Sequence, residues 1–394
     1  MPLPSVMLCF IKSKEIDMYS YIYKDGKKLR LGFTTGTCAA AAAKAAAWML
    51  LSGKKINTIH LQTPKGVNLE LPIRDIVFDP DSVSCAIRKD SGDDPDVTDG
   101  ILIYAKVSKN DQPGIHINGG QGVGRVTKKG LEQPVGEAAI NSIPRKMIQE
   151  NLTEVCDVFD HHSGLSVMIY VPEGEEISKR TFNSRLGIVG GISILGTSGI
   201  VEPMSDQALI DTIRLELNQR KVNGMRTVLL TPGNYGMDFL KDSLGIDPKI
   251  PVLTSNFIGD ALDCCRELGF TNVLLVGHIG KFVKIAGGML NTHSKYGDCR
   301  MEILASYAGA CGLRPTEIKE ILNAVTCDDA LRILKMFELD SEVLSHITDR
   351  ISFHLNRKTA GVPGVEAILF SKVYGQLCET SNASYLLRQI KEMI

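Results

Sequence analysis

Short apolar segments that alternate with helical patterns dominate the second half of the chain and constrain its fold most. Residues 227–230, 251–254 and 272–276 are each too short for a helix, and each leads through a loop into a helical pattern. Strands that alternate with helices form parallel sheets with helices on both faces. We therefore predict an α/β domain over residues 186–313 with an open, mostly parallel, Rossmann-like sheet.

The first half has a different order of elements. Thr-Thr-Gly-Thr at residues 34–37 precedes an alanine-rich run, and alanine is the strongest helix former. Further segments predict strands, the first two paired as a hairpin: 57–62, 67–73, 82–88, 101–107 and 167–171. These patterns predict an α+β domain over residues 31–185 after a weakly patterned tail over residues 1–30. Residues 314–394 are predicted to form a helical segment packed on the second domain.

Charge and cysteine content exclude several classes of protein. Lys and Arg number 44 against 45 Asp and Glu, so the chain lacks the basic footprint of a nucleic-acid-binding protein. Its ten cysteines form no C-x-x-C pair, and scattered thiols are typical of a reducing compartment. The longest apolar stretch, residues 39–51, is too short to span a bilayer. We expect a cytoplasmic protein without nucleic-acid or membrane partners.

The turn before the alanine-rich helix has two interpretations. Backbone N–H groups at a helix start favour an anion, and the hydroxyls of Thr34, Thr35 and Thr37 add donors. The same residues can instead cap the helix, which is the commoner use of threonine at this position.

Two polar loops of the first half are further candidates. The segment 119–129 is glycine-rich and carries Arg125 and Lys128, which suit a carboxylate ligand, although a plain glycine turn fits equally well. Five aspartates lie between Asp90 and Asp99, but their spacing does not match a calcium loop, and a solvated turn or a loop that reaches a polar ligand fits better.

Ligands of parallel α/β sheets bind outside the carboxyl ends of the strands. The loop 231–236 follows a predicted strand there, and its Gly233, Asn234 and Gly236 let a ligand approach the backbone or form an ordinary strand-to-helix turn. A second segment, 277–294, follows another predicted strand. It carries four polar side chains suited to a ligand or to proton transfer: His278, Lys281, Lys284 and His293.

Four segments together resemble the cobalamin-biosynthesis family called CbiD. They are GFTTGTCAAAAAKAA at 32–46, SGDDPDVTDG at 91–100, GGQGVGRVTKKGL at 119–131 and GHIGKFVKIAGGMLNTHS at 277–294. The resemblance implies transfer of a methyl group from S-adenosylmethionine to C1 of cobalt-precorrin-5B, which gives cobalt-precorrin-6A in the anaerobic pathway. Cobalt would arrive inside the substrate, so no metal site in the protein is expected.

The resemblance also suggests roles for the candidate residues. The acidic tetrapyrrole is expected to bind Thr34, Thr35, Thr37, Arg125, Lys128, Lys281 and Lys284. The methyl donor is expected near Gly233, Asn234 and Gly236, and His278 and His293 are the candidate catalytic acid or base. Two other functions stay open, a small-molecule kinase and a non-enzymatic corrinoid carrier, and a homo-oligomer is compatible with the sequence.

Overall fold

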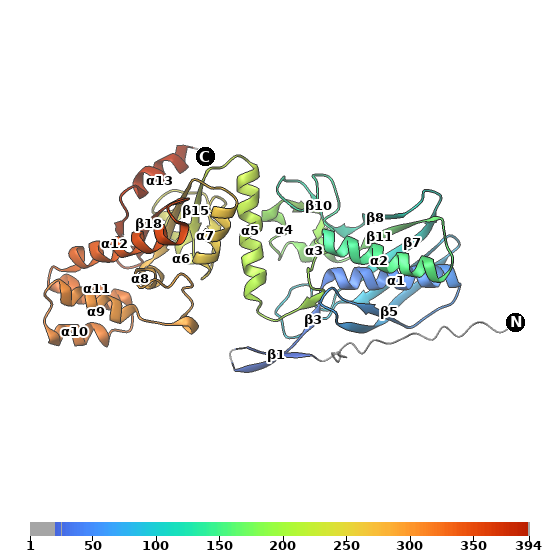
Figure 1. The fold of residues 1–394 in the computed structure, drawn as a ribbon, viewed down its shortest axis with the longest axis horizontal. Helices are drawn as coiled ribbons and strands as arrows, with labels where there is room; N and C mark the ends of the chain where they lie inside the picture. The colour runs from blue at the N-terminus through green and yellow to red at the C-terminus, as the bar shows by residue number, and fades with distance from the viewer. Residues whose placement is uncertain (1–19, 25, 393–394) are drawn as a thin grey trace. The chain divides into compact units, whose positions relative to one another are not determined.

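The computed structural model describes residues 20–24 and 26–392. The chain forms two compact units divided after Ser205, and each is described by itself (Figure 1). Most of the predicted N-terminal tail, residues 1–19, lies outside the described residues. The rest of that tail forms a small antiparallel ribbon of β1 (Tyr21–Lys24) and β2 (Lys27–Arg30). Among the described residues, no helix combines the length and apolar character that crossing a membrane requires.

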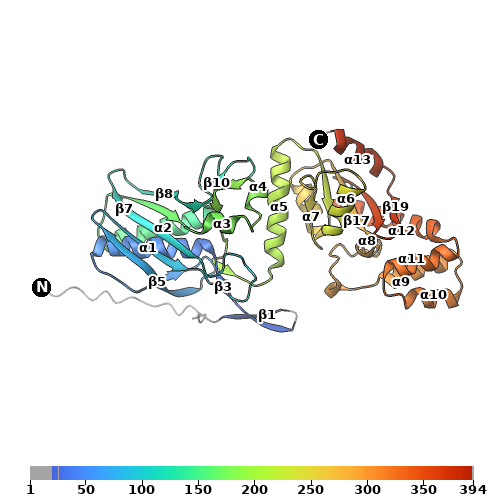
Figure 2. The same cartoon turned by 180° about the vertical axis from the view of Figure 1, so that it is seen from behind.

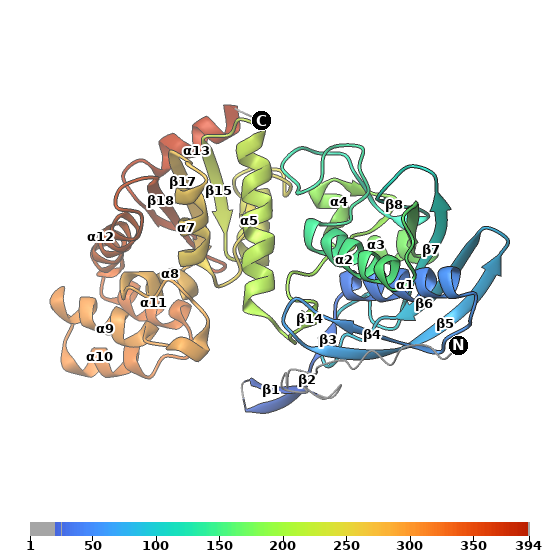
Figure 3. The ribbon, with the colours of Figure 1, turned by 45° about the vertical axis from the view of Figure 1, so that its right-hand side comes forward.

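A six-stranded sheet is the centre of the first unit. Its order is β4-β5-β6-β7-β11-β8, and all neighbouring strands are antiparallel except β11 and β8, which are parallel. Two long helices, α1 and α2, lie side by side on the sheet (Figures 1 and 3). The elements of this sheet and its helices are α1 (Thr35–Ser52), β4 (Thr58–Gln62), β5 (Asn68–Asp79), β6 (Ser82–Arg88), β7 (Leu102–Asn110), β8 (Ile115–Gly119), α2 (Ser142–Val158) and β11 (Gly164–Tyr170). The predicted hairpin of β4 and β5 is confirmed.

Helix α1 is buried because its side chains are small. Eight of its alanines are 0% exposed, which lets its backbone approach β6, β7 and α2 closely. Thr34 caps the start of the helix, and Gly53 ends it in the left-handed region at φ 66°. The alanine-rich run is therefore a central packing element of this unit.

The predicted boundary between the domains differs from the structure. We placed residues 186–205 at the start of the second domain, but their short strands pair with strands of the first unit. The pairs join distant parts of the sequence, and such pairing leaves no local signal. The short elements of this region are β3 (Gly32–Phe33), β9 (Gly122–Val123), β10 (Arg125–Val126), α3 (Gly174–Ser178), α4 (Asn183–Leu186), β12 (Ile188–Val189), β13 (Gly191–Ile192) and β14 (Ile200–Val201).

The second unit is built on a five-stranded sheet of order β16-β15-β17-β18-β19. Its first four strands are parallel, and β19 is an antiparallel edge strand. Alternate residues point to opposite faces: Val228 and Val273 pack with α5, α7 and α12, whereas Leu229 and Leu274 pack with α6 and α13. The elements in chain order are α5 (Asp206–Val222), β15 (Thr227–Thr231), α6 (Asn234–Asp242), β16 (Val252–Leu253), α7 (Ile258–Glu267), β17 (Asn272–His278), α8 (Ile279–Ala286), α12 (Asp340–Thr359), β18 (Gly364–Ser371), β19 (Gly375–Glu379) and α13 (Ala383–Glu392).

The C-terminal segment, predicted as mostly helical, also contains two strands that the prediction missed, β18 and β19. β18 pairs with β17 along seven residues and is nearly completely buried. A short apolar run of this kind cannot be distinguished from a buried helix by periodicity alone. Three α-helices between α8 and α12 pack on one another, and the first and third of them also pack on α12 (Figures 1 and 2). They are α9 (Arg300–Ala310), α10 (Pro315–Leu322) and α11 (Cys327–Met336).

Candidate functional site

The three threonines before α1 hold the protein's own backbone. Thr35 Oγ1 donates to the carbonyl of Ser193 at 3.2 Å and accepts from the N–H of Leu195 at 2.9 Å. Thr37 Oγ1 donates to the carbonyl of Gly199 at 2.7 Å, and Thr34 Oγ1 accepts from the N–H of Thr37 at 3.2 Å. All three side chains are buried. The hydroxyls therefore fasten the segment 193–199 to the start of the helix, and the geometry fits the capping interpretation.

The two predicted basic residues of the glycine-rich loop also contact backbone carbonyls. Arg125 Nη2 donates to the carbonyl of Gly119 at 2.8 Å, and Lys128 Nζ donates to the carbonyl of Arg185 at 3.2 Å. Both side chains are exposed, and neither lines the two adjoining hollows of the first unit that are described next. Their role in substrate binding stays a prediction.

A cavity of about 690 Å³ lies in the first unit, within the size range of small-molecule sites. It is open to solvent on one side and combines an apolar wall with basic groups. The apolar wall consists of Leu31, Phe33, Val67, Leu69, Leu71 and Ile200. The basic groups belong to Arg30, Lys65, Arg74, Arg88 and Lys89. A smaller hollow of about 350 Å³ adjoins it and shares Arg74, Arg88 and Gly100.

Three of the five basic side chains of the cavity are already neutralised. Arg30 forms a bidentate pair with Asp90, with contacts of 2.6 and 2.7 Å. Lys65 pairs with Glu202, and Lys89 pairs with Asp96 at 2.8 Å. These three cations offer little net charge to a ligand.

Arg74 and Arg88 differ from the other three, because neither has a hydrogen-bond or ion-pair partner among residues 20–24 and 26–392. Arg74 lies opposite Ala86 on the neighbouring strand, so Arg74 and Arg88 share one face of the sheet as diagonal neighbours. Like charges at this spacing repel. An anionic ligand with two carboxylates would relieve that repulsion, which makes this pair the strongest anion-binding feature of the cavity.

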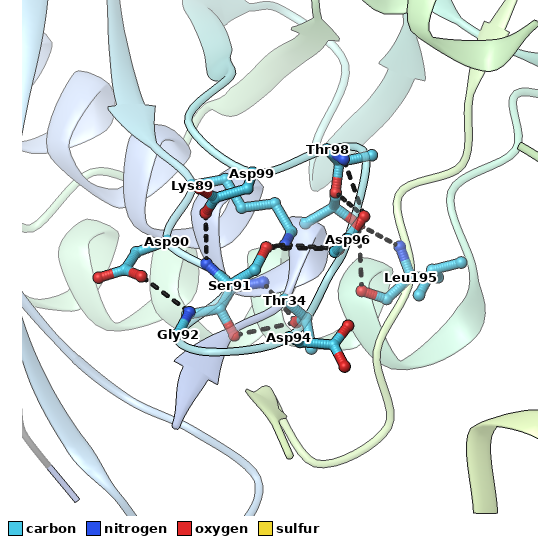
Figure 4. A network of polar contacts seen from close by, with 12 residues as sticks. Thr34, Lys89, Asp90, Ser91, Gly92, Asp94, Asp96, Thr98, Asp99 and Leu195 are labelled. Carbon is cyan, nitrogen blue, oxygen red and sulfur yellow. Dashed lines mark hydrogen bonds and ion pairs between the residues drawn. The ribbon is translucent and has the colours of Figure 1, made fainter. Parts of the chain in front are cut away.

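The aspartate-rich loop forms one wall of the cavity and is held by internal hydrogen bonds (Figure 4). Asp96 accepts from Lys89 Nζ and from the N–H of Thr98 at 2.8 Å each, and Asp99 accepts from the N–H of Ser91 at 2.8 Å. Outside this cluster, Asp90 accepts from Arg30, Asp93 from the N–H of Arg30 and Asp94 from the N–H of Met204. Because protein donors occupy these carboxylates, the loop is a fixed wall that orients Arg30 and Lys89.

Replacing Asp96 by asparagine should lower the free energy of unfolding by about 3 kcal/mol, since it leaves a buried ammonium without its counter-charge. Lys89 is only 2% exposed. Urea unfolding measures the change, and Asp81→Asn, at an exposed aspartate, is the matched control. Adding Lys89→Met to Asp96→Asn should recover part of the loss. An Asp96→Asn variant as stable as the control would contradict a buried ion pair.

In the second unit, Lys281 joins the loops that follow the three neighbouring strands β15, β16 and β17. Its Nζ donates to the carbonyl of Pro232 at 3.0 Å and to that of Ser255 at 3.4 Å. Burial lowers the pKa of Lys281, and the charge of Lys284 adds to the shift. Lys284 is itself buried and donates to the carbonyls of Thr292 and Gly297, at 3.3 and 3.0 Å. Both lysines therefore organise the strand-end loops from within.

The two predicted glycines of the loop after β15 are in different surroundings. A Cβ atom at Gly236 would lie 1.8 Å from Thr231 Oγ1, so only glycine lets α6 pack this closely on the strand. A Cβ atom at Gly233 would meet no described atom within 4 Å. Gly233 and Asn234 thus begin α6 beside open space, where a ligand can reach the backbone.

His278 lies at the end of β17, close to two aromatic rings, and a lysine lies over one of these rings. Its Nδ1 accepts from the N–H of Gly280 at 3.1 Å, so the neutral ring carries its proton on Nε2. Its ring centroid lies 6.0 Å from that of Tyr235 and 5.5 Å from that of Phe370. Lys372 Nζ lies 3.3 Å from the centroid of the Tyr235 ring. The ends of β15, β17 and β18 therefore bring His278, Tyr235 and Lys372 together, and we call these three residues the strand-end cluster.

His293 is exposed and lies at the start of a short 3₁₀ helix, Ser294–Tyr296, where its Nδ1 accepts from the N–H of Lys295 at 3.1 Å. No contact between His293 and the strand-end cluster occurs among the described residues.

Comparison with known proteins shows that this chain is similar to several enzymes that share one name. Residues 22–203 match the model of the family CbiD, and residues 291–381 match the model described as CbiD, C-terminal domain. A protein of Ruminiclostridium cellulolyticum named cobalt-precorrin-5B C(1)-methyltransferase is 47% identical over 378 residues, which cover 95% of this chain and 98% of that protein. The chain belongs to the CbiD family.

Other CbiD proteins are similar over comparable lengths. A protein of Clostridioides difficile with the same name is 39% identical over 405 residues, covering 94% of this chain and 99% of that protein. The crystal structure of cobalamin biosynthesis protein (cbiD) from Archaeoglobus fulgidus aligns with a TM-score of 0.38 at 29% identity, over 73% of this chain and 88% of that one.

The two matched ranges include different parts of the candidate sites. The cavity residues Arg74 and Arg88 fall within the first CbiD range, and Lys372 falls within the C-terminal range. His278 and Gly233 lie between the two ranges. The sequence analysis missed Arg74, Arg88, Tyr235 and Lys372. Lys372 follows β18, the strand that was predicted as helix, so the strand-end rule was not applied to it.

In this CbiD protein, His278 should make the free energy of unfolding pH-dependent. Burial lowers the pKa of His278 from 6.5, while Asp328 opposes the shift and Lys372 adds to it. As the pH decreases below about 6.5, His278 takes up a proton in the unfolded chain before it does so in the folded chain. The free energy of unfolding therefore decreases as the pH is lowered. His278→Asn, which retains an acceptor for the N–H of Gly280, should lose this component. Urea unfolding of both proteins between about pH 7.5 and about pH 5.5 measures it, and a constant difference between them would contradict the prediction.

Proposed function

We propose that the chain transfers a methyl group from S-adenosylmethionine to C1 of cobalt-precorrin-5B and releases cobalt-precorrin-6A and S-adenosylhomocysteine. The observation that carries this proposal is near-full-length similarity, at 47% identity, to a protein named for that reaction. Cobalt is then part of the substrate, and the reaction belongs to cobalamin synthesis in the cytoplasm.

We infer that the tetrapyrrole binds in the cavity of the first unit. The apolar wall suits a face of the macrocycle. The guanidinium groups of Arg74 and Arg88, which have no partner among the described residues, suit two of its peripheral carboxylates, because arginine binds carboxylates in a planar, bidentate manner. This inference moves the main basic contacts from Arg125, Lys128, Lys281 and Lys284 to two strand residues.

We infer that the methyl donor binds at the carboxyl ends of the parallel strands in the second unit, a domain that we interpret as Rossmann-like. Support comes from the open space at Gly233 and from the convergence of Tyr235, His278 and Lys372. Lys372 is suited to the donor's carboxylate. Lys281 is a positioning residue that holds the loops together.

The chemistry of transfer requires orientation rather than a protein nucleophile. An electron pair of the tetrapyrrole ring forms the new C–C bond, the S–CH₃ bond breaks, and its electrons stay on sulfur. The charge left on the ring is relieved by loss of a proton. A neutral His278 adds no positive charge beside the sulfonium and can accept a proton, which is compatible with its lowered pKa.

Anaerobic incubation of the purified protein with cobalt-precorrin-5B and methyl-labelled S-adenosylmethionine tests the proposal. The expected result is one labelled methyl group per tetrapyrrole and one S-adenosylhomocysteine per transfer, by mass analysis. Tight binding of the tetrapyrrole without transfer would instead favour a carrier. Binding of ATP in place of S-adenosylmethionine would favour a kinase.

A further inference from the structure

Helices α9 and α12 of the second unit pack against each other, and each contributes two side chains to one small cluster. Tyr307 on α9 is followed one turn later by Cys311 at its end, and Glu342 and His346 are four residues apart on α12. Residues four apart lie on the same face of a helix. The ligand-type atoms of Cys311, Glu342 and His346 all lie within 4.8 Å of one another.

The surroundings of these three side chains leave their ligand atoms available. The ring of Tyr307 stacks on that of His346 at a centroid distance of 6.0 Å and an angle of 14°, which orients the imidazole. Cys311 Sγ lies within 4.8 Å of a carboxylate oxygen of Glu342. Within the described part of the chain, Glu342 and His346 form no hydrogen bond or ion pair with any other residue.

We propose that Cys311, Glu342 and His346 form a binding site for one divalent transition-metal ion of the zinc class. Sulfur, imidazole nitrogen and carboxylate oxygen together match the ligand set of tetrahedral zinc, and a set of three leaves a fourth position for water. Glu342 and His346 are exposed and Cys311 is partly exposed, so rotation of the side chains can close the remaining distance. The bound ion would tie the end of α9 to α12.

The thiol must lose its proton on binding, so affinity should depend on pH. Metal affinity should therefore fall as the pH is lowered, with release of a proton on binding. The ligands come from separate helices and follow no local spacing motif, so no pattern in the sequence marks them. The expectation of no metal site had a different basis, namely that cobalt is part of the substrate.

Titration of the metal-free, full-length protein with zinc against a chromogenic chelator tests this site. We expect one zinc ion per chain, and a loss of affinity of more than about a hundredfold in Cys311→Ser and His346→Gln, beyond the loss typical of residues that only support a ligand. Cys299→Ser, at an exposed cysteine of the same unit, is the matched control and should bind as the wild type does.

Cobalt(II) binding provides a second readout that does not depend on activity. The wild type should show a thiolate-to-cobalt charge-transfer band, and Cys311→Ser should lack it while keeping its circular dichroism spectrum. Absence of a stoichiometric ion in the wild type would overturn the proposal. A charge-transfer band that persists in Cys311→Ser, or that disappears in Cys299→Ser, would also overturn it.

Discussion

Replacing Arg74 or Arg88 by glutamine should weaken the binding of cobalt-precorrin-5B by about ten- to a hundredfold for each variant. Each guanidinium is unpaired in the described structure and borders both adjoining hollows of the first unit. Hydrogen bonds to a charged group contribute about 1.5–3 kcal/mol each, which corresponds to this range of affinity. The absorbance change of the tetrapyrrole on titration with protein measures the dissociation constant.

The stability of the same variants separates a binding role from a structural one. Removing one of two neighbouring like charges should leave the free energy of unfolding unchanged or raise it by roughly 0.2–1 kcal/mol. Arg180→Gln, at an exposed arginine that lines neither hollow, is the matched control and should bind normally. Wild-type affinity in both Arg74→Gln and Arg88→Gln would exclude this cavity as the tetrapyrrole site.

Gly233→Val should weaken the binding of S-adenosylmethionine by about a hundredfold, or roughly 3 kcal/mol. The valine side chain fits the folded chain, because a Cβ atom at this position meets nothing within 4 Å. It would fill the space in which we place the donor. The melting temperature should stay within about 2 °C of the wild type, and calorimetric titration measures the affinity.

Two other glycines serve as controls for Gly233→Val. Gly364 lies at the amino end of β18, away from the strand ends that carry the loops, and its Cβ atom would meet no atom closer than 3.6 Å. Gly364→Val should therefore bind the donor normally. Gly236→Val should instead destabilise the fold, because of the contact with Thr231. Normal donor binding by Gly233→Val would move the donor site away from this loop.

Local sequence patterns predicted the elements that depend on local signals. The alternation of apolar segments with glycine loops predicted β15, β16 and β17, and composition predicted the alanine-rich α1. The strand-end rule also placed His278 at the end of a strand, and it is the last residue of β17. Lys281, predicted at the same strand end, lies within α8, which begins directly after β17. The roles of these residues stay proposals.

Features that depend on distant partners were missed. The strands of residues 186–205 pair with β3, β9 and β10, and β18 was hidden in an apolar run without a helical or alternating period. Whether Arg74 and Arg88 are available to bind a ligand also depends on residues that are distant in the sequence. Only the structure reveals that Lys65 is neutralised by Glu202, far along the chain, while these two arginines have no such partner among the described residues.

The position of the transferred methyl group tests the central claim most directly. Cobalt-precorrin-5B is incubated anaerobically with the protein and with S-adenosylmethionine that carries ¹³C in its methyl group, and the product is examined by NMR. We predict a single labelled methyl group on C1 of the ring, and far less label when the Gly233→Val variant replaces the wild type at a donor concentration near the wild-type dissociation constant. A label on another ring carbon, or an unlabelled tetrapyrrole recovered from wild-type protein that binds both compounds, would contradict the account.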